Sequence, residues 1–267
     1  MGCGVRHAGP FHAGTEKVGA RMRILLWAEF QKLRRSNIVL LTVFSVILIA
    51  VFVFIGGKTL ASSEQMTTHD AGWYMASTQV WATLFVLPAV TALLGSFMIC
   101  REEQEDTMKS LRIIPVSETK LTAAKMIVTF LVSVLLYGSL FVLTFLTEAI
   151  LHFSALSWEM VWDFGKMYVL DGVGVFLAVS PIIALVSYMK KSYWIALVIA
   201  ELYSFAGLFM SMSNALRTYY PITAVFGAAG YYETTAAGRF GSAGVLLLCG
   251  LLAVVLLKRL NNRHQDG

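Results

Sequence analysis

The sequence has little charge, and this shortage excludes most soluble architectures. Only 14% of the 267 residues are Asp, Glu, Lys or Arg, whereas soluble domains carry about 25%. The chain has 3 cysteines, too few for a disulfide scaffold, and its net charge of +5 is modest for a nucleic-acid-binding protein. Hydrophobic residues make up 57% of the sequence and fall in long unbroken runs. We therefore expect an integral membrane protein that binds no nucleic acid.

The sequence also lacks the polar segments and motifs that catalysis needs. Its longest polar stretch, residues 101–125, is too short for a domain of about 50 residues or more. The tripeptide Gly57-Lys58-Thr59 resembles the end of a phosphate-binding loop, but Phe52 stands where that motif requires its first glycine. No spacing typical of a metal site or a nucleophilic triad is present in the sequence. We therefore expect no enzyme and no cofactor bound by this chain.

Six stretches are apolar and long enough to cross a bilayer, since a membrane helix needs about 20 such residues. None shows the strict alternation of a membrane β-strand. The predicted spans are residues 36–57, 71–100, 126–147, 172–189, 192–216 and 240–257. The sequence therefore predicts an all-α integral membrane protein with six transmembrane helices.

Lys and Arg are distributed unevenly between the two sides of the predicted bundle. Seventeen of the 21 lie on the side that holds both termini. The other side holds Lys58, Lys166, Arg217 and Arg239. Because positively charged loops stay in the cytoplasm, we expect a multi-pass protein of the cell (plasma) membrane with both termini cytoplasmic.

The two ends of the chain lie outside the predicted bundle. Residues 1–21 hold five glycines and no apolar run, which predicts a disordered extension. The six-span domain is expected over residues 22–260, and residues 261–267 would form a cytoplasmic tail.

The segment before the first span has helical periodicity. Leu26, Phe30 and Leu33 recur at spacings of four and three residues, with Glu29 and Lys32 on other faces. This pattern predicts a short elbow helix lying in the headgroup region. A charged lead-in to the first span is the alternative.

The loop between the second and third predicted spans is the most informative polar segment. Thr107 follows an acidic run and is a good first residue for a helix, and Met108, Leu111 and Arg112 would share one face before Pro115 ends the turn. A short amphipathic helix of this kind could enter a groove of a cytosolic partner. A solvated loop without a docking role fits the charge pattern equally well.

This loop resembles that of ABC-2 type transporter permeases. Residues 105–125 read Glu-Asp-Thr-Met-Lys-Ser-Leu-Arg-Ile-Ile-Pro-Val-Ser-Glu-Thr-Lys-Leu-Thr-Ala-Ala-Lys, with the acidic residue, Thr, Leu, Pro-Val and final Lys of that family. Residues 29–36 resemble the family's elbow, and the resemblance covers about residues 22–260. It is strongest to the lantibiotic and bacitracin self-protection exporters. Asp106, where many relatives have Gly, and Glu118, where a basic residue is frequent, depart from the pattern.

The resemblance implies a permease subunit that exports an amphipathic or lipid-associated substrate, such as an antimicrobial peptide, and so gives resistance. ATP would be bound by a separate ATPase subunit in two copies, and a second permease chain, identical or related, would complete the pathway among membrane lipids. The residues expected to couple this chain to the ATPase are Glu105, Thr107, Met108, Leu111 and Arg112. A lipid or lipid-linked glycan exporter is the alternative, and an ATP-independent secondary transporter has less support.

Three residues are candidates for the substrate pathway. Glu201 lies about nine residues into the fifth predicted span, where a carboxylate costs about 2.5–3.5 kcal/mol unless it is paired, protonated or hydrated. We expect it to face the bundle or a dimer interface, in a structural or a pathway role. Tyr219 and Tyr220 lie in the outer segment 213–239, which would form two half-helices in the outer leaflet or an ordinary aromatic belt. Asp171 is placed near the outer face.

Overall fold

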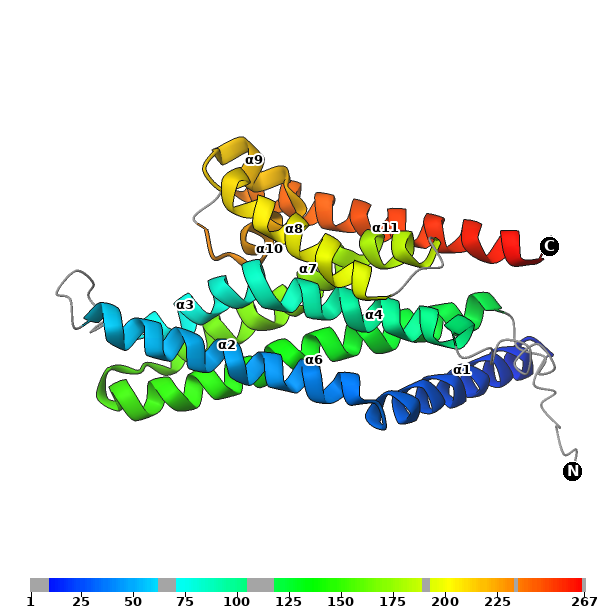
Figure 1. Ribbon diagram of the computed structural model, residues 1–267, viewed down its shortest axis with the longest axis horizontal. Helices are drawn as coiled ribbons and strands as arrows, with labels where there is room; N and C mark the ends of the chain where they lie inside the picture. The colour runs from blue at the N-terminus through cyan, green and yellow to red at the C-terminus, as the bar shows by residue number, and fades with distance from the viewer. Residues whose placement is uncertain (1–9, 62–70, 105–117, 189–192, 233–234, 266–267) are drawn as a thin grey trace, which may run out of the picture.

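The computed structural model describes residues 10–61, 71–104, 118–188, 193–232 and 235–265. Every regular element within these ranges is helical, as predicted (Figure 1). The elements are α1 (Pro10–Arg34), α2 (Asn37–Ala61), α3 (Trp73–Trp81), the π-helix η1 (Ala82–Val86), α4 (Leu87–Gln104), α6 (Glu118–His152), the 3-10 helix η2 (Phe153–Ala155), α7 (Trp158–Tyr188), α8 (Trp194–Met210), α9 (Asn214–Tyr219), α10 (Pro221–Ala229) and α11 (Ala236–Gln265).

Five helical stretches in the described part of the chain are long and apolar enough to cross a membrane. They are Asn37–Gly57, Trp73–Arg101, Thr119–Ala155, Trp158–Ser187 and Ala236–Arg259. Each contains or overlaps one of the predicted spans. The remaining predicted span, residues 192–216, contains α8, which is apolar but has only 17 residues. The count of six therefore stays a prediction.

Helices α4 and α7 form the centre of the bundle. In the most apolar window of each span, 78% of the residues are buried for Trp73–Arg101 and 67% for Trp158–Ser187, against 22% for Ala236–Arg259. Figure 1 shows α2 and α6 on one side of these central helices, and α8 and α11 on the other. The outer helices expose many Leu, Ile, Val and Phe side chains, as expected of helices that face lipid.

Helix α1 differs from its prediction in length. It begins at Pro10, so residues 10–21 are helical, within the segment predicted to be a disordered extension. Helix α11 likewise continues to Gln265, into the predicted tail 261–267. The boundaries of the domain at residues 22 and 260 stay predictions.

The apolar face predicted for α1 is only partly correct. Leu33 is buried and Leu26 is half-buried, but Phe30 is exposed. Glu29, which was placed on a polar face, is buried and accepts a hydrogen bond of 2.8 Å from Lys32 Nζ. The face of α1 that packs against the bundle therefore differs from the face that periodicity alone predicts. From residue 22 onward, its exposed large apolar side chains are Ile24, Trp27 and Phe30.

Helix α7 is much longer than the predicted fourth span, which began at residue 172. In the structure this helix starts at Trp158. The prediction missed the first residues because the charged Asp163 and Lys166 interrupt the apolar window, although they do not end the helix. The two side chains form a surface ion pair of 2.7 Å. Asp171 therefore lies about 20 Å along the helix, near the middle of a 30-residue apolar stretch. Its predicted position near the outer face stays a prediction.

Two glycines let α7 occupy the centre. A Cβ at Gly172 would lie 2.9 Å from Val134 Cα, so α6 and α7 make backbone contact at this point. Ser133 Oγ donates to the Gly172 carbonyl at 2.8 Å across the same contact. A Cβ at Gly174 would lie 2.9 Å from Val225 Cγ1, which brings α10 against the middle of α7. Small residues commonly allow such close approach between membrane helices.

A buried carboxylate from α6 caps the start of α3. Glu148 is fully buried, and it accepts hydrogen bonds from the backbone N–H groups of Gly72 at 2.8 Å and Tyr74 at 3.2 Å. His152 Nδ1 lies 2.8 Å from Glu148 Oε1. The first N–H groups of a helix have no partner within that helix, and a negative charge there is also favoured by the helix dipole. Glu148 therefore fixes the outer part of α3 to α6.

We expect Glu148→Ala to lower the thermal unfolding temperature of the detergent-solubilised protein. The substitution leaves the N–H groups of Gly72 and Tyr74 buried without an acceptor, at a cost of about 1–3 kcal/mol each. Glu159→Ala is the matched control, because Glu159 is an exposed carboxylate on the neighbouring helix α7. Equal unfolding temperatures for the two variants would show that the cap does not hold α3 in place.

Candidate functional site

A polar pair lies at the centre of the bundle, where α3 meets α7. Gln79 Nε2 donates to Asp171 Oδ2 at 2.7 Å, and both side chains are fully buried. Asp171 Oδ1 and Gln79 Oε1 have no hydrogen-bond partner among the described residues. A buried carboxylate with a single donor is costly, and ionisable groups within membrane spans are commonly functional. The Asp171–Gln79 pair is therefore a candidate site that sequence reasoning missed.

Tyrosine and threonine hydroxyls continue this polar interior. Tyr168, one turn before Asp171 on α7, donates to the Met75 carbonyl at 2.7 Å. Tyr137 of α6 lies 3.0 Å from Thr83 Oγ1 in η1, and Thr144 Oγ1 lies 3.5 Å from the Tyr168 hydroxyl. These contacts join α6 and α7 to the α3–η1 segment. Side-chain bonds across helices of this kind can fix one arrangement of a polar interior.

The partner segment of Asp171 is irregular. Gln79 lies in the last turn of α3, and the π-helix η1 begins directly after Trp81. A hydrogen bond from the Leu87 N–H to the Ala82 carbonyl closes the last turn of η1. Pro88 follows Leu87 in the first turn of α4 and has no N–H to donate. Such π-turns are rare within helices and occur often at functional sites.

Glu201 lies in the first half of α8, seven residues after Trp194 and so about 10 Å along the helix. Its side chain is only partly buried. Its carboxylate makes no hydrogen bond or ion pair to any residue in the described part of the chain. The single chain thus gives Glu201 no partner, and its role as a pathway residue stays a prediction.

The two candidate tyrosines point in different directions. Tyr219, the last residue of α9, is 63% exposed. Tyr220 folds back onto α8, where its hydroxyl donates to the Tyr203 carbonyl at 2.5 Å and the two rings lie 5.2 Å apart. Partial burial raises the pKa of the Tyr220 hydroxyl above its ordinary value. The structure therefore does not bring Tyr219 and Tyr220 together in one site.

The segment between α8 and α11 forms two short helices, α9 and α10. Helix α10 begins with Pro221 and ends at Ala229, and it is followed by the C-cap residue Gly230, whose φ of 88° is left-handed. Its residues from Ile222 to Gly227 are buried against α7, α8 and α11. Beside it, the Arg217 guanidinium lies 4.4 Å from the centre of the Tyr232 ring, a cation–π contact. This segment is a packed part of the bundle.

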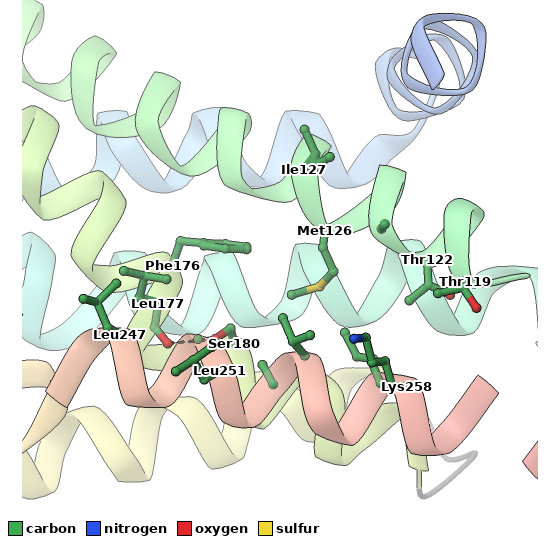
Figure 2. Close-up of a pocket in the computed structure, with 15 residues that line it drawn as sticks. Thr119, Thr122, Met126, Ile127, Phe176, Leu177, Ser180, Leu247, Leu251 and Lys258 are labelled. Carbon is green, nitrogen blue, oxygen red and sulfur yellow. Dashed lines mark hydrogen bonds between the residues drawn. The ribbon is translucent and has the colours of Figure 1, made fainter. Parts of the chain in front are cut away.

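An apolar groove lies between α6, α7 and α11, at the end of the bundle where α6 begins and α11 ends (Figure 2). It has a volume of about 460 Å³. Most of its lining is hydrophobic, from Met126 and Ile127 of α6, Phe176 and Leu177 of α7, and the 247–257 stretch of α11. Thr119, Thr122 and Lys258 supply the polar groups at one end.

The five residues predicted to couple this chain to an ATPase, Glu105 to Arg112, lie outside the described residues. The helices that flank them are α4, which ends at Gln104, and α6, which begins at Glu118. Their role therefore stays a prediction.

We expect Asp171→Asn to unfold at a temperature no lower than the parent, and Asp171→Ala to unfold at a lower one. The Asn amide can accept from Gln79 Nε2 and donate to the unpartnered Gln79 Oε1, whereas Ala leaves the Gln79 donor buried without a partner. The loss on substitution to Ala is about 1–3 kcal/mol. Thermal unfolding of both variants in detergent measures the difference. An Asn variant as unstable as the Ala variant would show that the pair depends on the carboxylate charge.

Comparison with known proteins shows the family of the chain. A family model described as "ABC-2 family transporter protein" matches residues 25–207. The chain is also similar to the bacitracin transport permease protein BCRB of Bacillus licheniformis, with 29% identity over 118 residues. This match covers 44% of the chain and 56% of that relative, so the chain spans about half the length of the curated protein it matches. Because the family model covers more than half of the sequence, the chain belongs to the ABC-2 family of transporter proteins, as a multi-pass membrane permease.

Proposed function

We propose that this chain is the permease subunit of an ABC exporter that moves an amphipathic or lipid-associated substrate out of the membrane. The observation that carries the proposal is the family match over residues 25–207, which includes the loop between α4 and α6. Its relative is named a bacitracin transport permease. An antimicrobial peptide of that amphipathic kind is therefore the substrate class we propose, with resistance as the outcome.

We propose six spans in the plasma membrane, with α8 as the fifth, and both termini cytoplasmic. In support, Figure 1 shows the start of α1 and the end of α11 at the same end of the molecule. An even number of crossings produces this arrangement. Lys120, Lys258 and Arg259 are exposed at the ends of helices there, in agreement with the rule that basic residues stay cytoplasmic. We propose α1 as the elbow, with Ile24, Trp27 and Phe30 in the headgroup region.

Energy would come from a separate ATPase subunit, in two copies, that binds ATP, while this chain binds no cofactor. The ABC-2 family normally works with such a subunit. A second permease chain, identical or related, would complete the pathway. In that pair, the partly buried Glu201 and the exposed Tyr219 are the residues we propose to face the pathway or the second chain.

A secondary transporter independent of ATP is the alternative from another class. One observation supports this alternative. The buried Asp171 is a second ionisable group within the apolar helices, besides Glu201. The family match favours the ATP-driven function. Dependence of transport on ATP hydrolysis separates the two.

We expect Leu111→Asp and Thr107→Pro to reduce the amount of ATPase that stays with the permease after detergent extraction, and to reduce ATPase stimulation. A buried anchor such as Leu111 would contribute about 2 kcal/mol or more to docking, and proline at Thr107 removes the residue that caps the helix. Phe153→Asp is the control, because Phe153 is 83% exposed at the opposite end of α6. Retention and stimulation equal to the parent in both loop variants would contradict a coupling role.

Cells that express the permease with its ATPase are expected to survive higher concentrations of bacitracin or another membrane-active peptide than cells with either subunit alone. An ATPase variant that binds but does not hydrolyse ATP is the control, since it keeps the complex and removes its energy source. Minimal inhibitory concentrations measure the effect. Unchanged sensitivity of cells with the complete complex to all such peptides would remove the support for a protective role.

A further inference from the structure

We propose that the groove between α6, α7 and α11 is a binding site for an anionic phospholipid, with one acyl chain in the groove and the phosphate at Lys258. The site is separate from the Asp171–Gln79 pair and goes beyond the proposed export function. The three helices that form it are all long and apolar enough to span a membrane. The groove is therefore reached from the bilayer, and lipid is the ligand available at highest concentration.

The length of the groove matches one leaflet. Its lining on α11 runs from Leu247 to Lys258, which is about 16 Å at 1.5 Å per residue. The hydrocarbon core of a bilayer is about 30 Å thick, so one leaflet contributes about half of that depth. The volume of about 460 Å³ lies within the range of about 300–1,000 Å³ typical of small-molecule sites.

The groove is also polar at one end and apolar at the other, as a lipid is. Figure 2 shows Thr119, Thr122 and Lys258 at one end, and Phe176, Leu177 and Leu247 at the other. The hydroxyl of Ser180, which lies between them, donates to the Leu177 carbonyl at 2.8 Å and so is satisfied within the helix. The apolar part of the groove therefore suits a hydrocarbon chain rather than water.

Close packing shapes the deep wall of the groove. A Cβ at Gly250 would lie 2.9 Å from Leu177 Cδ2, so this glycine lets the Leu177 side chain of α7 pack directly on the backbone of α11. Ala253 is fully buried beside it, with Ala184 and Leu257 in the same cluster. The small side chains on α11 leave room on the side of α6, where Ala123 and Met126 line the space.

Charge selects the headgroup. Among the residues that line the groove, Lys258 is the one with a charge, and Figure 2 shows its side chain extending from α11 toward the space beside α6. Lys120 is exposed at the same end, in the first turn of α6. Basic pockets between membrane helices are known to bind anionic lipid head groups. A phospholipid with net negative charge therefore fits this end better than a zwitterionic one.

Titration of the purified full-length chain with phosphatidylglycerol or phosphatidylcholine of the same acyl chains, followed by native mass spectrometry, tests the site. We expect the first phosphatidylglycerol to bind about fivefold more tightly than the first phosphatidylcholine. Lys258→Gln should remove this preference. Arg259→Gln, which deletes a neighbouring exposed charge outside the groove lining, should keep it.

A second pair of variants tests the groove itself. Ala123→Phe places a ring in the space and should abolish the tight site for both lipids, whereas Ala237→Phe, at an exposed position of α11 far from the groove, should leave it intact. Equal affinity for the two lipids, equal loss in the Lys258 and Arg259 variants, or tight binding retained by Ala123→Phe would each overturn the proposal. If Ala123→Phe does not fold, the comparison of Lys258→Gln with Arg259→Gln still tests the proposal. The assay needs neither ATPase nor cargo, so its failure is distinct from failure of the export function.

Discussion

Backbone contact between α6 and α7 at Gly172 is the constraint on which the rest of the structure depends. Because a Cβ at this position would lie 2.9 Å from Val134 Cα, any larger residue would separate the two helices. The contact holds α7 at the centre of the bundle, which buries Asp171 beside Gln79. The opposite face of α7, at Gly174, packs against Val225 of α10.

Polar and apolar interiors occupy different halves of this bundle. From the start of α3 to η1, the buried side chains of Glu148 and Tyr168 bond to backbone groups of α3, and Asp171 accepts one hydrogen bond from Gln79 while its Oδ1 has no partner among the described residues. Toward the start of α6, the space between α6, α7 and α11 is almost wholly hydrocarbon-lined and ends at Lys258. A transporter of amphipathic molecules would use both kinds of surface, and the central helix α7 contributes to each.

Sequence alone predicts the helical class, five of the spans and the family, because long apolar runs and one loop motif are local signals. It does not place Asp171 beside Gln79, because that contact joins helices distant in the sequence and because Asp163 and Lys166 interrupt the apolar run near the start of α7. Periodicity likewise predicts an exposed Glu29 and a buried Phe30, whereas in the structure Glu29 is buried and bonded to Lys32 and Phe30 is exposed. Tyr219 and Tyr220 are neighbours in sequence, but the end of α9 between them sends one outward and one onto α8. These outcomes depend on partners distant in the sequence.

The central claim is that this chain forms a transport pathway driven by a separate ATPase. The most direct measurement is the movement of a fluorescent amphipathic peptide in proteoliposomes that contain the permease and its ATPase. The account predicts that movement requires both proteins and stops when ATP is replaced by an analogue that is not hydrolysed. Movement of the peptide through the permease alone, driven by an ion gradient and indifferent to ATP, would contradict it.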